Sequence, residues 1–166
     1  MAKKARNELR KLTLYAHGAG EVTLDDVMAV VADASEMKLD PIVDAAFAGN
    51  AATIESEFGK AMVAGTYPGV IVSAAQRHAA ALHKASLAMD EGASPATAAD
   101  SGFPRLHFSR KGAVETALRN FNAARLAQVI DQLAAAALDS RKQAALAAAI
   151  VQRALIVIAA SARRRG

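Results

Sequence analysis

The chain has 166 residues, a formal net charge of +4 and an isoelectric point near 9.6. Hydrophobic residues make up 53% of it, which is enough for a packed core and excludes an intrinsically disordered chain. It contains no cysteine, which excludes disulfides and thiol chemistry. Because alanine and leucine dominate the apolar content and β-branched residues never alternate along the chain, the sequence predicts an all-α protein.

Two helices are predicted before residue 33. The opening residues MAKKARNELRKL carry the positive charge of a signal peptide but lack the apolar stretch that would follow it. Thr23 is the predicted N-cap of the second helix, with Asp26 three residues later in the capping-box position. We expect the apolar stripe of this helix to be buried, and its members are Leu24, Val27, Met28 and Val31.

A composition shift over residues 33–41, DASEMKLDP, is the only sign of a domain boundary. Pro41 fits the first turn of a new helix, where its missing N–H costs nothing. Gly49 and Asn50 would end that helix and cap the next one. Helical periodicity then predicts helices over about 51–64, 68–90, 95–101 and 111–121.

Asn122 is a plausible cap for the next helix, with a break at Asp139–Ser140 before the last one. The last helix is apolar nearly all round, which predicts that it is buried on most sides. Its most apolar segment, residues 144–160, is interrupted by Gln152 and Arg153. We expect it to be too short and too polar to span a bilayer, which indicates a soluble protein.

No motif predicts a nucleotide site. Gly59 and Lys60 resemble the end of a phosphate-binding loop, but Ile54 stands where that loop needs glycine. Ala61 replaces the hydroxyl that would bind magnesium.

Histidine and carboxylate spacing predicts no metal or acid–base site either. His78 and His83 are five residues apart, roughly 140° around a helix, so they cannot share a metal ion. His78 falls on the apolar stripe of its helix and is expected to be a hydrogen-bonded core histidine. Asp40 and Asp44 would be ordinary first-turn partners of a helix dipole. We therefore expect no catalytic site, no cofactor and no metal.

The stretch SGFPRLHFSRKGAVETALRNF, residues 101–121, holds three of the five phenylalanines. Residues 94–120 have the outline of a DNA-binding helix-turn-helix, although its second helix offers no Asn or Gln on the face that would read adenine. In the alternative, Phe103, Phe108 and Phe121 plug a joint between helices while Arg110 and Lys111 face water. We expect all three rings to be mostly buried.

Taken in order, three segments resemble the C-terminal part of the delta subunit family of the bacterial DNA polymerase III clamp loader. Residues 7–36, from NELRKL through VTLDDV, are similar to the family's Asn-Glu-Leu-x-Lys-Leu helix, glycine turn and Thr-x-x-Asp-Val helix. Residues 41–58, PIVDAAFAGNAATIESEF, resemble its Leu-Val-Asp-Ala-x-x-x-Gly-Asp/Asn helix pair. Residues 92–142 follow its Ser-Pro-x-x-x-Ala segment and the helices after it. The family's His-Pro-Phe turn is replaced by Leu-His-Phe-Ser, residues 106–109.

The resemblance implies a short two-helix remnant of the AAA+-like lid domain at residues 1–38. A helical collar domain, which joins neighbouring subunits in a ring, would follow at residues 39–166. A delta subunit has about twice this length, so we expect the chain to be a fragment that lacks the N-terminal domain which contacts the sliding clamp.

The implied function is a non-catalytic assembly module that takes part in loading the clamp onto primed DNA in the cytoplasm. The activity of the parent complex is that of a DNA-directed DNA polymerase. The implied partners are the ATPase and delta-prime subunits of the clamp loader, with weak contact to DNA and none to a membrane. The resemblance also suggests that Arg141 and Lys142 contact DNA phosphates; the alternative is that both are merely solvated.

Overall fold

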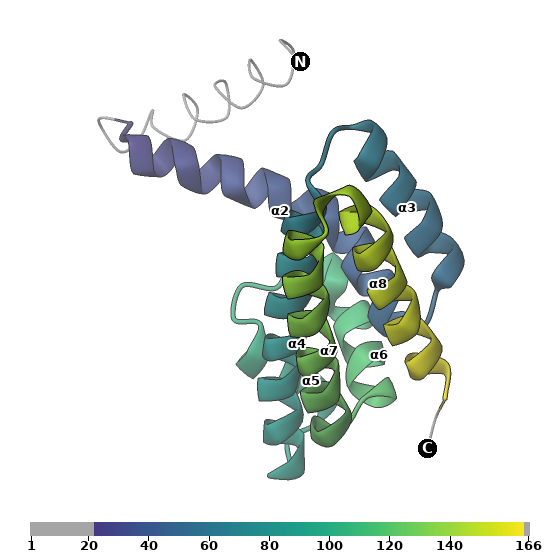
Figure 1. Ribbon diagram of the computed structural model, residues 1–166. Coiled ribbons are helices and arrows are strands. Elements are labelled where there is room, and N and C mark those ends of the chain that lie inside the picture. The colour runs from purple at the N-terminus through teal and green to yellow at the C-terminus, as the bar shows by residue number, and fades with distance from the viewer. Residues whose placement is uncertain (1–21, 165–166) are drawn as a thin grey trace. The chain divides into compact units, whose positions relative to one another are not determined.

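The computed structural model describes residues 22–164, and every regular element in that range is a helix (Figure 1). The first of the two helices predicted before residue 33 lies outside these residues. The predicted all-α fold is therefore confirmed. In chain order the elements are α2 (Leu24–Ala48), α3 (Ala51–Val63), α4 (Pro68–Asp90), α5 (Pro95–Gly102), η1 (Phe108–Arg110), α6 (Lys111–Asn120), α7 (Ala123–Lys142), η2 (Ala144–Leu146) and α8 (Ala147–Arg163).

The chain divides into two compact units, Met1–Asp40 and Pro41–Gly166. Helix α2 begins in the first unit and ends in the second, and the division falls two residues after the position expected from the sequence. A helix boundary within residues 33–41 was expected, and this expectation is wrong because α2 runs through them with Pro41 inside. A proline removes one backbone hydrogen bond from a helix, and α2 tolerates that loss here.

The N-terminus of α2 has the predicted capping box. The amide of Thr23 donates to Asp26 Oδ2 at 3.0 Å, and the amide of Asp26 donates to Thr23 Oγ1 at 3.2 Å. The backbone hydrogen bond from Thr23 holds the pKa of the Asp26 carboxyl below its usual value. The expected buried stripe is wrong, however, because Leu24 is 74% exposed and Met28 and Val31 are exposed as well.

The helix boundaries of the second unit follow the predicted caps. Asn50 Oδ1 accepts from the amide of Thr53 at 3.1 Å, and Asn122 Oδ1 accepts from the amide of Arg125 at 2.9 Å. Gly49, which lies between α2 and α3, has φ +84°, a conformation that only glycine adopts without strain. Short polar side chains thus start these helices where the sequence places them.

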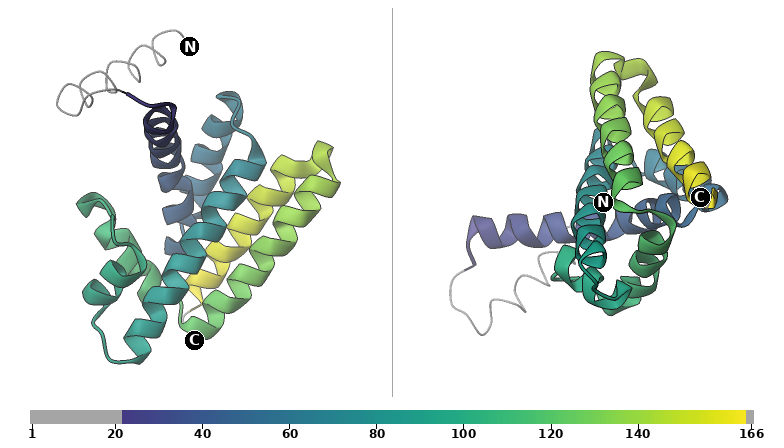
Figure 2. Two further views of the ribbon diagram at one scale, coloured as in Figure 1. Left: turned by 90° about the vertical axis from the view of Figure 1, so that its left-hand side faces the viewer. Right: turned by 90° about the horizontal axis from the view of Figure 1, so that it is seen from below.

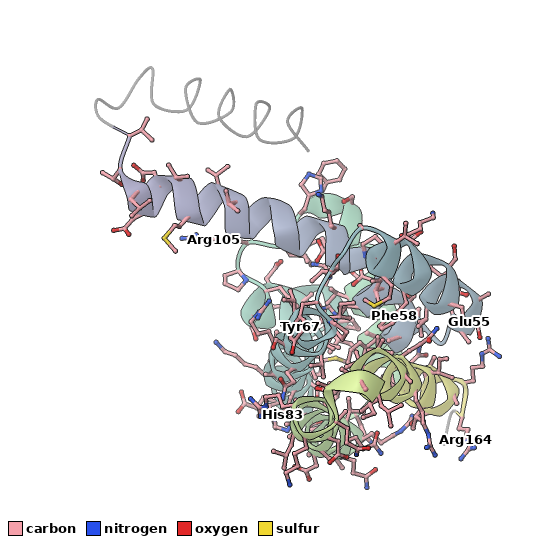
Figure 3. All side chains as sticks on the ribbon, turned by 45° about the horizontal axis from the view of Figure 1, so that its top comes forward. Glu55, Phe58, Tyr67, His83, Arg105 and Arg164 are labelled. Atoms are coloured by element: carbon pink, nitrogen blue, oxygen red, sulfur yellow. The ribbon has the colours of Figure 1, made fainter. Side chains whose placement is uncertain are left out.

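Helix α4 is the centre of the second unit and packs against α5, α6, α7 and α8. Helices α4, α7 and α8 lie side by side and alternate in direction, α3 packs on α8, and α5 and α6 pack on each other (Figures 1 and 2). On α3, Phe58 points inward and Glu55 points to solvent (Figure 3). The largest fully buried side chains are Phe47, Phe121, Ile42, Ile54, Ile71, Leu82, Leu126, Leu133, Leu155, Ile158, Val72 and Val114.

Two expectations for the end of the chain are wrong. Helix α7 does not break at Ser140, because Ser140 Oγ bonds back to the carbonyl of Ala137 at 2.9 Å and the helix continues to Lys142. Helix α8 is not buried on most sides. It buries one face of six residues, which are Ala147, Val151, Leu155, Ile158, Ala159 and Ala162, while Val157 on the other side is 45% exposed.

The segment Ala144–Arg163 is, by length and composition alone, apolar enough to cross a membrane, with a mean hydropathy of 2.0 in its window. This corrects the expectation that the segment is too short and too polar. A core helix of a soluble protein passes the same test, and one face of α8 packs on α3, α4 and α7. The segment therefore does not indicate a membrane location by itself.

Gly102 should be intolerant of a side chain. A Cβ atom at this position would lie 2.3 Å from the carbonyl oxygen of Ala81, and backbone atoms of α4 cannot move aside easily. We expect Gly102→Ala to lower the free energy of unfolding by about 1–3 kcal/mol, measured by urea denaturation. Gly112→Ala is the matched control, because a Cβ there meets nothing within 4 Å and should be neutral or slightly stabilising.

Candidate functional site

The polar centre of the second unit is an ion pair between α2 and η1. Arg110 Nε and Nη2 donate to Asp44 Oδ2 and Oδ1 at 3.0 and 2.7 Å, so the pair is bidentate, and both side chains are mostly buried. Arg110 was expected to face water in the packing interpretation, and Asp44 was expected in the first turn of a helix. Both expectations are wrong, because α2 is continuous and carries Asp44 to the loop before α6.

Next to this ion pair lies a stack of aromatic rings around His78. The His78 ring is 5.2 Å from that of Phe47 and 5.1 Å from that of Phe103, and Phe121 meets Phe47 edge-on at 5.6 Å. His78 is only 6% exposed, and burial lowers its pKa to about 4, which outweighs the opposing effect of Asp44. The predicted core location of this histidine is confirmed, although its Nε2 lies 3.9 Å from Asp44 Oδ1, beyond hydrogen-bond distance. The low pKa makes the ring neutral at pH 7.

Three helix C-termini meet beside the stack, and side chains bond to their carbonyl groups. Asn120 Nδ2 donates to the carbonyl of Phe47 at 3.1 Å, near the end of α2. Arg125 donates to the carbonyls of Asn120, the last residue of α6, and of Ser161, in the last turn of α8. The last carbonyls of a helix have no partner within it and carry its negative dipole end, so these donors stabilise all three ends.

Two further contacts complete this joint, which we define as Asp44, Phe47, Gly49, His78, Phe103, Arg110, Asn120, Phe121, Arg125 and Arg163. The guanidinium of Arg125 lies 4.9 Å from the centre of the Phe121 ring, within range of a cation–π interaction. Arg163 Nε donates to the carbonyl of Gly49 at 2.7 Å. Within the joint, Asp44, Arg110, Asn120 and Arg125 are paired with one another or with backbone carbonyls. The geometry is therefore that of a structural joint.

The three phenylalanines of residues 101–121 have different environments. Phe121 is 1% exposed and Phe103 is half-buried in the stack, but Phe108 is 81% exposed, so its predicted burial is wrong. The 3₁₀ turn of η1 directs Phe108 outward while its neighbour Arg110 turns inward to Asp44. The Phe108 ring lies 4.5 Å from the ring of His107, which is also exposed.

Residues 94–120 do form two helices separated by a turn, the outline expected of a helix-turn-helix. On α6, Lys111 and Arg119 are exposed, but Arg119 Nη2 lies 3.7 Å from Glu115 and Lys111 Nζ lies 3.6 Å from Asp100. The cations of this helix are therefore partly neutralised. The opposite face of α6 is buried through Val114 and Leu118.

Arg141 and Lys142 are exposed in the last turn of α7. They were expected at the start of the last helix, and they lie instead before η2, at the negative end of the α7 dipole. Cations are favoured at a helix C-terminus, so the helix dipole alone accounts for two basic residues at this position, and no bound ligand is needed to explain them. It also leaves both side chains accessible to an anion.

The other sequence candidates do not come together. Gly59 and Lys60 lie inside α3, not in a loop, and Lys60 Nζ pairs with Glu57 at 3.1 Å. Among the side chains that the structure describes, no group of three His, Cys, Asp or Glu could hold a metal ion. Sequence reasoning missed Asn120 and Arg125, because their hydrogen bonds go to carbonyls of distant helices.

Comparisons with protein-family models, curated proteins and solved structures found no match to this chain.

The buried His78 should make stability depend on pH. Between about pH 6.5 and pH 4 the unfolded chain binds a proton that the folded chain does not, so stability falls as pH decreases across this window. We expect a loss of about 3 kcal/mol, since one pKa unit corresponds to about 1.4 kcal/mol. Urea denaturation at several pH values should show this slope in the wild type and a flatter one in His78→Leu. Val70→Ala, an exposed and non-titrating position on the same helix, should keep the wild-type slope.

The phenylalanines provide a test of the joint. Phe121→Ala should lower the free energy of unfolding by about 3–5 kcal/mol, because the ring is fully buried. Phe108→Ala should change it by less than about 0.5 kcal/mol, the usual range for surface positions. Thermal and urea denaturation measure both, and equal losses in the two variants would contradict the assignment of Phe108 to the surface.

Proposed function

We propose that the chain is a non-catalytic assembly module of a bacterial DNA polymerase III clamp loader, corresponding to part of the lid domain and the collar domain of the delta subunit. The order of the three sequence segments that resemble this family supports the proposal. The observation that carries it is the all-helical compact unit from Pro41 to Gly166, which begins two residues after the expected start of the collar.

The joint is consistent with a scaffold. A domain that holds its neighbours in a ring needs helices with a fixed geometry, and the joint ties α2, α6, α7 and α8 together through groups that pair with one another. His78 is neutral and enclosed by rings, and Asp44 is engaged by Arg110. These groups are thus assigned to structure, in agreement with a module that has no chemistry of its own.

Co-elution with clamp loader subunits tests the proposal. The purified chain, mixed with the ATPase and delta-prime subunits, should elute with them in one size-exclusion peak, because the collar alone is proposed to join the ring. Phe121→Ala, which disturbs the joint, should reduce this co-elution, whereas Phe108→Ala should not. Separate elution of the wild-type chain at micromolar concentrations would reject the proposal.

A contact between Arg141, Lys142 and DNA phosphates is the second part of the proposal. Such contacts carry no sequence information and weaken with salt, so the isolated chain should bind DNA weakly and without sequence preference. Arg141→Glu combined with Lys142→Glu should slow DNA-stimulated clamp loading by the rebuilt complex and leave its assembly intact. The matched control reverses two other exposed cations, Lys60→Glu with Lys84→Glu. Equal loading rates for the two double variants across a salt series would show that residues 141 and 142 are ordinary surface.

A helix-turn-helix DNA-binding regulator, using residues 94–120, is the second candidate. The exposed Phe108 favours it, because an accessible ring beside the exposed cations Arg105 and Lys111 suits contact with nucleic acid. The pairing of Arg119 with Glu115 disfavours it. A regulator should show sequence-specific duplex binding in a selection from random DNA, and this binding should be lost in Phe108→Ala.

A further inference from the structure

The outer face of α8 combines apolar side chains, small side chains and cations in a regular order. Six exposed residues lie along it from the N-cap to the C-cap of the helix, and they are Leu146, Ala149, Arg153, Val157, Ala160 and Arg164. At about 100° per residue they fall within a sector of roughly 80°, opposite the buried face. We call these six residues the α8 stripe.

The α8 stripe has an internal repeat. Leu146 and Val157 are 11 residues apart, as are Ala149 and Ala160, and Arg153 and Arg164. Eleven residues make slightly more than three turns, so each pair lies along the helix axis with about 16 Å between its members. The stripe thus presents two large apolar side chains, two small alanine side chains and two guanidinium groups, each pair with the same spacing.

All the charged side chains from residue 140 to residue 165 are cations. From Ser140 to the C-terminus there is no aspartate or glutamate, while the cations are Arg141, Lys142, Arg153, Arg163, Arg164 and Arg165. Among the described residues no carboxylate forms an ion pair with Arg153 or Arg164, and Arg164 extends from the end of α8 into solvent (Figure 3). The rim of the stripe is apolar, since Ile150 and Ile156 are half-buried on its two sides.

We propose that the α8 stripe is a docking surface for an amphipathic, acidic helix of a partner protein. Helices pack closely where small residues leave gaps for the side chains of the other helix, and Ala149 and Ala160 leave such gaps beside Leu146 and Val157. The partner helix carries carboxylates at the spacing of Arg153 and Arg164, and arginine binds carboxylates with two parallel hydrogen bonds.

The same observations disfavour two other occupants. A second copy of this chain, docked through the same stripe, would offer no carboxylate, so Arg153 and Arg164 would face like charges or apolar side chains. Nucleic acid presents a phosphate charge every few ångströms, whereas the two arginines are about 16 Å apart with apolar side chains between them. An acidic helix matches both the charge and the apolar surface.

The inference rests on the proposed function only in assuming that the chain works by binding another protein. It is tested with a fluorescein-labelled synthetic helix that carries two glutamates 11 residues apart and two leucines 11 residues apart on one face. The folded chain should bind this probe in a fluorescence anisotropy titration. Arg153→Glu combined with Arg164→Glu should weaken binding by about tenfold or more. Lys84→Glu with Arg105→Glu is the matched control, and it should leave binding unchanged.

The decisive comparison is between this acidic probe and a probe of opposite charge. A helix with lysines in place of the two glutamates should bind poorly to the wild type. It should bind more tightly to the doubly reversed variant, and thermal denaturation of that variant checks that it is folded. Val157→Ala should also weaken binding of the acidic probe, which distinguishes docking from attraction by charge alone.

Three results would overturn the inference. The first is equal binding of both probes to all variants. The second is concentration-dependent self-association in sedimentation equilibrium that disappears in the reversed variant. The third is binding of a DNA duplex, but of neither peptide, through Arg153 and Arg164. Loss of co-elution with the clamp loader subunits is a separate result that rejects only the proposed function, because the probe titration needs none of those subunits.

Discussion

The bidentate ion pair between Asp44 and Arg110 fixes the geometry on which the second unit depends. Asp44 lies on α2 and Arg110 on the turn before α6, 66 residues later in the chain. A largely buried guanidinium and carboxylate stabilise a fold only when both are present and well oriented, since either one alone would be an unpaired buried charge. The pair therefore selects one placement of η1 against α2. The rings of Phe47 and Phe103 both lie next to His78 beside this ion pair.

The other polar contacts of the joint follow from the way in which the helices end. Helices α2, α6 and α8 terminate close together, and their unpaired carbonyls would be costly to bury. Asn120 and Arg125 supply the missing donors, and Arg163 adds a third at Gly49. A guanidinium can serve two helix ends at once because its donors point in different directions, which a lysine could not reproduce. The joint is thus specific in its residues as well as in its packing.

Helix α8 connects this interior to the proposed partner surface. Its inner face supplies Val151, Leu155 and Ile158 to the core, and its last turn receives Arg125. Its outer face carries the α8 stripe. Because the inner face is held by packing and the C-terminus by hydrogen bonds, the stripe is presented on a rigid element. A preordered surface loses less conformational entropy on binding, which favours association with a partner helix.

The sequence by itself determined the helices, because caps and helical periodicity are local. Asn50 and Asn122 each cap a helix as expected, and α4 has the predicted bounds Pro68–Asp90. It also placed His78 in the core, because His78 lies on the apolar stripe of α4, which is buried, unlike the apolar stripe predicted for α2.

Only the tertiary structure decided which neighbour each side chain meets. Arg110 turned inward and Phe108 outward, although hydrophobicity alone predicts the reverse, because Asp44 lies within reach of the arginine. One face of α8 stayed exposed, since the number of helices around it is a property of the whole fold. Long-range partners such as Asn120 and the carbonyl of Phe47, 73 residues apart, leave no trace in local periodicity.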